Sequence, residues 1–102
     1  MRGHVRQELA HDFPEVALVA ARAMGMLGSD AGYAIAQQGG KSADPRQRLL
    51  AALAFGAIGR LDAQPILAGL LKDAEPAVRV AAATAVLELQ APAREQAAGG
   101  AR

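Results

Sequence analysis

The residues that most often carry enzyme chemistry are few and widely spaced in this sequence. His4 and His11 are seven residues apart, about 10 Å along a helix, which is too far for both to bind one metal ion. No histidine and aspartate accompany Ser29, Ser42 or Thr84 in the arrangement of a nucleophilic triad. Cysteine is absent, which excludes disulfides and cysteine-based zinc sites. The sequence therefore predicts no catalytic residue, no metal site and no cofactor.

One short segment is similar to the end of a phosphate-binding loop. Residues 39–42 read GGKS, but the full motif needs a glycine five positions before Gly40, and that position is Ile35. No buried strand precedes the segment either. We therefore interpret Gly39 and Gly40 as an ordinary turn between two helices.

A fixed spacing organises the rest of the chain. Pro14, Pro45 and Pro76 are 31 and 31 residues apart, and each begins an alanine-rich segment. Proline is favoured at the first position of a helix, where its missing N–H has no helical partner. Other residues keep the same step of 31, among them the pairs Gly25/Gly56, Gly28/Gly59 and Lys41/Lys72. A period of this length predicts stacked repeats.

Each unit is expected to contain two helices. The spacing predicts first helices over residues 14–27, 45–58 and 76–89, with Asp12 and Asp44 as caps and Gly28 and Gly59 at the ends. Second helices are predicted over residues 31–38 and 65–72. In the first helix the expected core face is Val16, Val19, Ala20, Ala23 and Leu27.

The central unit is expected to be the best packed, because helices on both sides should cover it. Its expected core residues are Leu53, Phe55, Ile58, Ile66, Leu67, Leu70 and Leu71. Aromatic residues make up only 3% of the chain, so alanine must supply much of the core.

The predicted domain is a half repeat at residues 2–12, full repeats at 14–42 and 45–73, and another half repeat at 76–90. Residues 91–102 are predicted to form a frayed tail or linker, because they are rich in small residues and contain Gly99 and Gly100. This incomplete pattern favours a fragment of a longer protein. The first dozen residues lack the apolar run of a signal peptide, so a cytoplasmic protein is expected if Met1 is the native start. No apolar stretch is long enough to span a membrane.

Residues 44–73 and 73–89 resemble HEAT-like repeats, in particular the short kind first described in phycobilisome lyases. Their pattern is D-P-x-V-R-x-A-A-x-A-L-G, followed by G-D-x-x-x-x-P-x-L; this chain has DPRQRLLAALAFGAIG and DAEPAVRVAAATAVLEL. The resemblance implies an all-α fold, an α-solenoid of stacked antiparallel helix pairs with about six helices in a HEAT-like superhelix. The first full repeat departs from the pattern, because Ala17 replaces the arginine found at Arg48 and Arg79.

The resemblance leaves several functions open, since similar repeats occur in scaffolds, chromophore lyases, a metal-dependent hydroxylase and DNA glycosylases. The hydroxylase would need His–Glu pairs, which are missing here. We expect a non-catalytic module that binds a protein partner or flanking domains of its parent chain. One alternative is part of a chromophore-lyase-like or other enzyme assembly, although Phe13, Tyr33 and Phe55 are the only aromatic residues. A nucleic-acid-binding domain is the other, although eleven Lys and Arg face ten Asp and Glu.

Two sets of residues are candidates for these roles. In the resembled fold the second helices line a concave face, which makes Gln37, Lys41, Gln64 and Lys72 the candidate partner-binding residues. Arg48 and Arg79 each lie three residues after a proline. The resemblance favours a ladder in which they pair with acidic residues of neighbouring turns and join the repeats. Binding of anions is the alternative, because a guanidinium suits carboxylate or phosphate.

Overall fold

The computed structural model describes the backbone of residues 13–100 and the side chains of residues 13–90. The described part holds five α-helices, a short 3-10 helix and no strand. They are α2 (Pro14–Met26), α3 (Tyr33–Gly40), α4 (Pro45–Ile58), the 3-10 helix η1 (Leu61–Ala63), α5 (Gln64–Leu70) and α6 (Pro76–Gly100). The predicted all-α solenoid fold is confirmed. The predicted half repeat 2–12 and the cap Asp12 lie outside the described residues.

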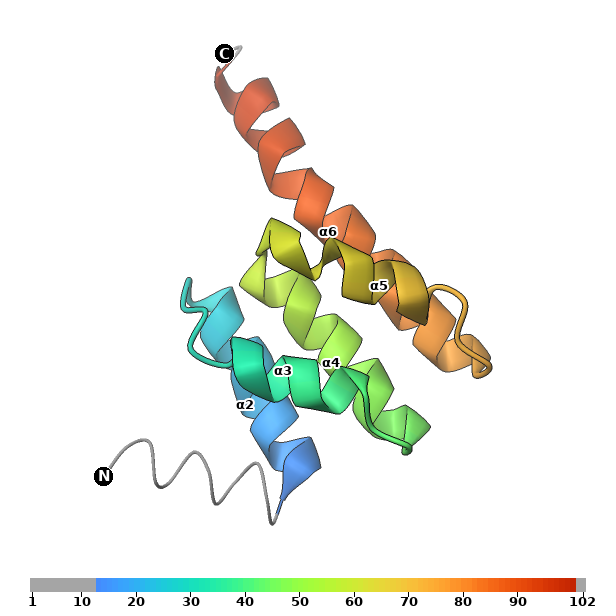
Figure 1. Cartoon of the computed structure of the whole chain (residues 1–102). Coiled ribbons are helices and arrows are strands. Elements are labelled where there is room, and N and C mark those ends of the chain that lie inside the picture. The colour runs from blue at the N-terminus through green and yellow to red at the C-terminus, as the bar shows by residue number, and fades with distance from the viewer. Residues whose placement is uncertain (1–12, 101–102) are drawn as a thin grey trace, which may run out of the picture.

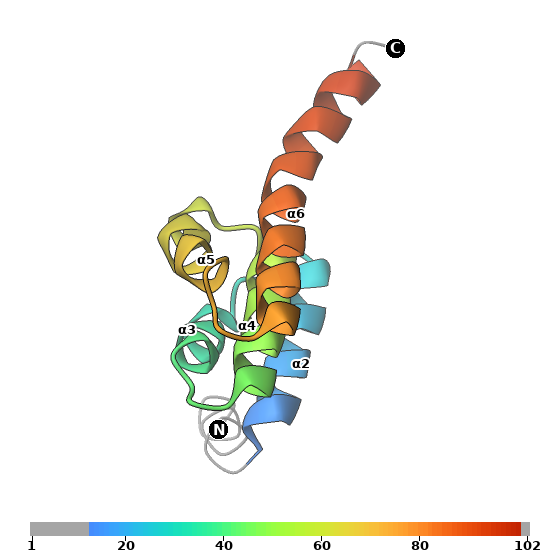
Figure 2. The ribbon, with the colours of Figure 1, turned by 90° about the vertical axis from the view of Figure 1, so that its right-hand side faces the viewer.

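The helices form two layers. α2, α4 and α6 lie side by side and run in the same direction (Figure 1), and α4 contacts both of its neighbours. α3 and α5 run in the opposite direction and lie together on one side of this layer (Figure 2). We call α2, α4 and α6 the first layer, and α3 and α5 the second layer.

Short signals in the sequence set the helix ends. Each first-layer helix begins at its proline, and the Asp44 carboxylate accepts a 2.9 Å hydrogen bond from the Arg46 amide, as expected of a cap. Gly28 and Gly59 have φ of 90° and 78°, a left-handed conformation in which a side chain is unfavourable. The second-layer helices are shifted from their predicted ranges: α3 is Tyr33–Gly40, and α5 follows η1 and ends at Leu70.

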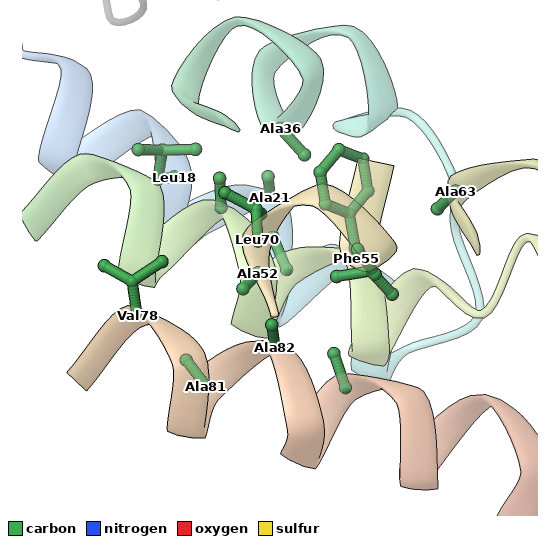
Figure 3. Packing of buried hydrophobic residues seen from close by; sticks show 14 of the residues in the cluster. Leu18, Ala21, Ala36, Ala52, Phe55, Ala63, Leu70, Val78, Ala81 and Ala82 are labelled. Carbon is green, nitrogen blue, oxygen red and sulfur yellow. The ribbon is translucent and has the colours of Figure 1, made fainter. Parts of the chain in front are cut away.

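Many of the buried core residues are alanines, and in Figure 3 they lie among a few larger side chains such as Phe55 and Leu70. The largest side chains that are fully buried are Phe55, Leu18, Leu67 and Val78. Their burial stabilises the fold by about 1.5–3 kcal/mol each. Leu53, Ile58 and Ile66 are only partly buried, and Leu71 is 39% exposed. The prediction for Leu71 is therefore wrong, because it follows the last residue of α5 and turns away from the core. Close approach of the helices is documented at glycines, where Gly25 and Gly56 of the first layer have backbone atoms of the next helix directly beside them.

The predicted core face of α2 is also wrong. Val16, Val19 and Leu27 are 55%, 54% and 87% exposed, whereas α2 buries another face, which holds Ala17, Leu18, Ala21 and Gly25, against α4 and α3. In α6 the positions equivalent to the exposed face, 62 residues later, are buried. The pattern therefore identified a genuine packing face of the repeat, but no described helix covers it in α2.

α6 is longer than the sequence analysis predicts. It was expected to end near residue 89, but its backbone stays helical through Pro92 to Gly100. Alanine, arginine, glutamate and glutamine are strong helix formers and supply much of this extension. Pro92 removes one backbone hydrogen bond, which a helix can tolerate at a cost in stability. That residues 91–102 act as a tail or linker stays a prediction.

Candidate interaction surface

The four predicted partner-binding residues are all exposed on or beside the second layer. Gln37 lies within α3, and Lys41 follows as the residue that ends the helix, so the two are four residues apart on one face. Gln64 begins α5, and Lys72 lies two turns further on, just beyond its end. Lys41 and Lys72 are separated by the repeat step of 31. The second layer therefore presents two short polar stripes, each ending in a lysine.

The charged residues in this part of the second layer are cations. Neither α3 nor α5 contains a carboxylate; Lys41 directly follows α3, and Lys72 is the second residue after α5. Both lysines lie where the helix dipoles are negative, which favours a cation. The exposed amides of Gln37 and Gln64 can both donate and accept hydrogen bonds. This arrangement suits a polar partner with carboxylates near the two lysines.

The end of α3 also shows why Gly39 is glycine. Gly39 is buried, and a Cβ there would lie 2.7 Å from the Leu18 Cδ2 atom of α2 and 3.1 Å from the Ala51 Cβ atom of α4. The glycine therefore lets α3 pack closely on the first layer. This packing accounts for glycine at position 39, so a phosphate-binding role is not needed to explain it.

Arg48 connects the two inter-repeat loops. Its guanidinium donates two hydrogen bonds to the Asp73 carboxylate, at 2.7 and 3.0 Å, and two more to the carbonyl oxygens of Ser42 and Ala43. The Arg48 and Asp73 side chains are 18% and 9% exposed. The Arg48 guanidinium holds the pKa of Asp73 below its ordinary value, with a smaller contribution from the backbone N–H of Glu75.

Arg79 makes part of the same arrangement. It donates hydrogen bonds of 2.7 and 3.3 Å to the carbonyl oxygens of Asp73 and Ala74, but it makes no ion pair within the described side chains. The equivalent position of the first repeat, one step before Arg48, is Ala17, which has no guanidinium. Glu15 and Arg46 form a 2.6 Å ion pair between the first turns of α2 and α4. Both groups are largely exposed, so this pair contributes little to stability.

A cluster at the start of the second layer was missed by the sequence analysis. The Arg60 guanidinium carbon lies 4.0 Å from the ring centre of Tyr33, which is 8% exposed and packs edge to face on Phe55. Asp62 accepts two hydrogen bonds from Arg60, at 3.1 and 2.6 Å. Arg60 thus joins η1 to the beginning of α3. The sequence gives little indication of this cluster. Arg60 and Asp62 have charged side chains of the kind that usually lie on the surface, and a full helix separates them from Tyr33.

This cluster shifts two pKa values. Burial raises the pKa of Tyr33, and the nearby Asp62 carboxylate raises it further, because both disfavour the tyrosinate. Arg60 lowers the pKa of Asp62 through its hydrogen bonds. The arrangement keeps Tyr33 neutral and Asp62 ionised, and it ties two repeats together.

The hydroxyl groups singled out in the sequence make local backbone contacts. Ser29 and Ser42 accept hydrogen bonds from the amides of Ala31 and Asp44, and Thr84 donates to the carbonyl oxygen of Val80. Among the described residues, no group of three or more His, Cys, Asp or Glu could hold a metal ion. His4 and His11 lie outside this range. None of the helices described here combines the length and the hydropathy needed to cross a membrane.

Comparison with known proteins gives one result. A family model for HEAT repeats matches residues 4–88, which is most of the chain. No curated protein and no solved structure gives a significant match. The matched range includes both layers and the 31-residue step that relates their helices. The chain therefore belongs to the HEAT repeat family.

Proposed function

We propose that this chain is a non-catalytic HEAT-like module that binds a protein partner, or a flanking domain of a longer parent chain, through its second layer. HEAT repeats generally serve as protein-interaction scaffolds. The observation that carries the proposal is a pair of exposed lysines, Lys41 and Lys72, which are one repeat step apart and lie just beyond the ends of α3 and α5. Each helix also exposes one glutamine, although Gln37 and Gln64 are not equivalent by the repeat step. Repeat proteins bind through contacts that are spread over such extended surfaces.

The chemistry of the stripe describes the partner. Gln37 and Gln64 offer hydrogen bonds without charge, and the two lysines favour carboxylates at one end of the surface. The partner is therefore a polar protein segment with acidic side chains beside Lys41 and Lys72. Two stripes give a small contact area, so a weak and readily reversible interaction is expected.

In this proposal Arg48 and Arg79 are structural rather than anion-binding. Arg48 donates four hydrogen bonds to loops of its own chain, two of them to the Asp73 carboxylate. An incoming anion would have to compete with Asp73 for the same guanidinium. Arg79 keeps the connection between α5 and α6 in place through two carbonyl oxygens.

Photo-crosslinking in the full-length protein tests the surface. A photoreactive residue at Gln37 or Gln64 should capture the partner, whereas the same residue at Arg22 or Thr84, exposed on the first layer, should not. Charge reversal by K41E and K72E should weaken capture from both second-layer positions. Stronger capture at Arg22 or Thr84 would assign binding to the first layer instead.

The non-catalytic part of the proposal has its own test. Elemental analysis of the purified and dialysed chain should find no stoichiometric metal ion. Assays for chromophore-lyase, hydroxylase and DNA-glycosylase activity should show no turnover. A stoichiometric metal or a measurable turnover would overturn it.

A further inference from the structure

The first layer contains the same helix contact twice, once between α2 and α4 and once between α4 and α6. Each helix uses one face toward the unit before it and another toward the unit after it. The face toward the following unit is buried in α2, where it holds Leu18, Ala21 and Gly25, and its equivalents in α4 are Leu49, Ala52 and Gly56. A stripe of the form L-x-x-A-x-x-x-G is thus common to the two helices that have a following neighbour.

The face toward the preceding unit is covered, fully or in part, in α4 and α6, which have a preceding helix. In α6 this face consists of Val78, Ala81, Ala82, Ala85 and Leu89, which are at most 9% exposed. The equivalent face of α2, 62 residues earlier, consists of Val16, Val19, Ala20, Ala23 and Leu27. We call these five residues the open face of α2. Its three large side chains are all more than half exposed.

We propose that the open face of α2 is a docking surface for one further helix of the same type, which carries a stripe L-x-x-A-x-x-x-G and runs parallel to α2. The argument is continuity with the two existing contacts, since the open face has the position and the residue types that α6 presents to α4. It depends on the repeat geometry alone and is independent of the function proposed for the second layer.

The glycine of the stripe is essential to this contact. A Cβ atom at Gly25 would lie 2.7 Å from the backbone nitrogen of Ile58 and 2.9 Å from the carbonyl carbon of Ala57. A Cβ at Gly56 would lie 2.9 Å from the Ala85 Cα atom. The helices therefore approach so closely that no side chain fits between them at this position. Leu27 occupies the position of Ile58, so the docked helix needs glycine opposite Leu27.

This requirement excludes a second copy of the chain, stacked end to end, as the occupant. The outer face of α6 carries Val80, Ala83 and Leu87 at the three stripe positions. Leu87 stands where the stripe has glycine, and it is 57% exposed. Because its side chain would collide with the backbone of the neighbouring helix, α6 cannot take the place of the missing helix on another copy. The two ends of the first layer therefore differ: α2 accepts a further repeat helix, and α6 does not offer one.

A reporter thiol tests the open face, because the chain has no cysteine. Ala23 is exposed, whereas its equivalents Ala54 and Ala85 are fully buried, so A23C reports whether a helix covers the face. A second copy of residues 45–75, which contains the stripe, is inserted directly before Pro14. This keeps the junction between a glutamate and a proline found at residues 75 and 76. We expect the A23C thiol to react with a maleimide at least about tenfold more slowly than in the chain without the insertion.

Two matched controls separate docking from a general effect of length. The same 31 residues inserted between Glu75 and Pro76 should leave A23C labelling fast, because the open face stays uncovered. The insertion before Pro14 with Gly56→Leu in the inserted copy should also leave labelling fast. Circular dichroism shows whether each inserted unit has become helical.

Several results would overturn the proposal. One is fast labelling of A23C in the chain whose unit before Pro14 has become helical. Another is an inserted unit that becomes helical after Glu75 but not before Pro14. In the chain without insertions, labelling that slows with protein concentration would indicate a second copy on the open face. Labelling that accelerates when residues 1–12 are deleted would indicate that this segment covers it.

Discussion

Single glycine residues determine how closely the first-layer helices pack. Gly25 faces the backbone of α4, and a methyl group there would lie within 3 Å of three atoms of Ala57 and Ile58. Gly69 in α5 has open space at the same point, although it too is the second-to-last residue of its helix. The two positions thus share their place in a helix and differ in their surroundings.

Replacing each glycine by alanine should therefore have different effects on the free energy of unfolding. Gly25→Ala forces α2 and α4 apart and should lower the free energy of unfolding by about 1–2 kcal/mol. This value already includes the smaller gain from the higher helix propensity of alanine. Gly69→Ala should leave it unchanged or raise it by up to about 1 kcal/mol, because only propensity changes. Urea denaturation of the two variants measures both values. Equal effects would show that the close approach of α2 and α4 can relax without cost.

The single tyrosine makes it possible to follow the cluster of Tyr33, Arg60 and Asp62 by absorbance. Burial and the Asp62 carboxylate raise the pKa of Tyr33 above 10.0, so the folded state favours neutral tyrosine. The resulting stability is present below pH 10 and is lost as the pH rises through the higher folded pKa. Ultraviolet absorbance should show tyrosinate forming at higher pH in folded than in denatured chain. Asp62→Asn should remove part of the shift, because burial is the larger cause; an unshifted midpoint would place Tyr33 in water.

At the scale of elements, α5 shows how the end of a helix decides which leucine belongs to the core. Leu70 is the last residue of α5 and is 6% exposed, while Leu71 follows the helix as its C-cap residue and is 39% exposed. Leu70→Ala should lower the free energy of unfolding by about 2–5 kcal/mol, as for other buried large-to-small changes. Leu71→Ala should cost clearly less. Chemical denaturation measures both, and a loss below about 0.5 kcal/mol for Leu70→Ala would mean that the side chain is not buried.

The helices themselves could be predicted because proline and glycine mark their ends. Pro14, Pro45 and Pro76 each begin a first-layer helix, and Gly28 and Gly59 follow two of them in the left-handed conformation. These are local effects of the backbone, so a single sequence contains them. The end of α6 was missed because alanine-rich sequence stays helical past the point where the repeat pattern stops.

Which face of a helix is buried could be predicted only in part. The apolar stripe of Val16, Val19 and Leu27 is a packing face in the repeat, but its burial depends on a neighbouring helix. Alanine and glycine fill both faces of α4, so hydrophobic periodicity alone does not tell the two apart. The four candidate residues of the second layer are exposed, as a binding surface requires. The Tyr33 and Arg60 contact depends on how two repeats stack, which no local pattern specifies.

At the scale of the whole molecule, stacking depends on contacts that repeat along one axis. Because each repeat contacts only its neighbours, the stability of the array is close to the sum of the stabilities of the single repeats and of the interfaces between them. The contact between Arg48 and Asp73 is the most buried ion pair in the described part, and it joins residues 25 apart in the chain. It should therefore affect the unfolding of the whole array rather than one loop.

Acid titration should isolate this contribution. Because Arg48 lowers the pKa of Asp73 below 3.8, the ionised carboxylate stabilises the folded state above that pH, and the stabilisation is lost as the pH falls through the lower folded value. Asp73→Asn should reduce the denaturation midpoint at neutral pH, and the difference from the original chain should shrink in acid. Asp30→Asn, whose carboxylate lies 3.6 Å from Arg60 and is exposed, should change the midpoint little. A difference for Asp73→Asn that is constant from neutral pH to pH 3 would show that shape and hydrogen bonding, rather than the charge of Asp73, hold the repeats together.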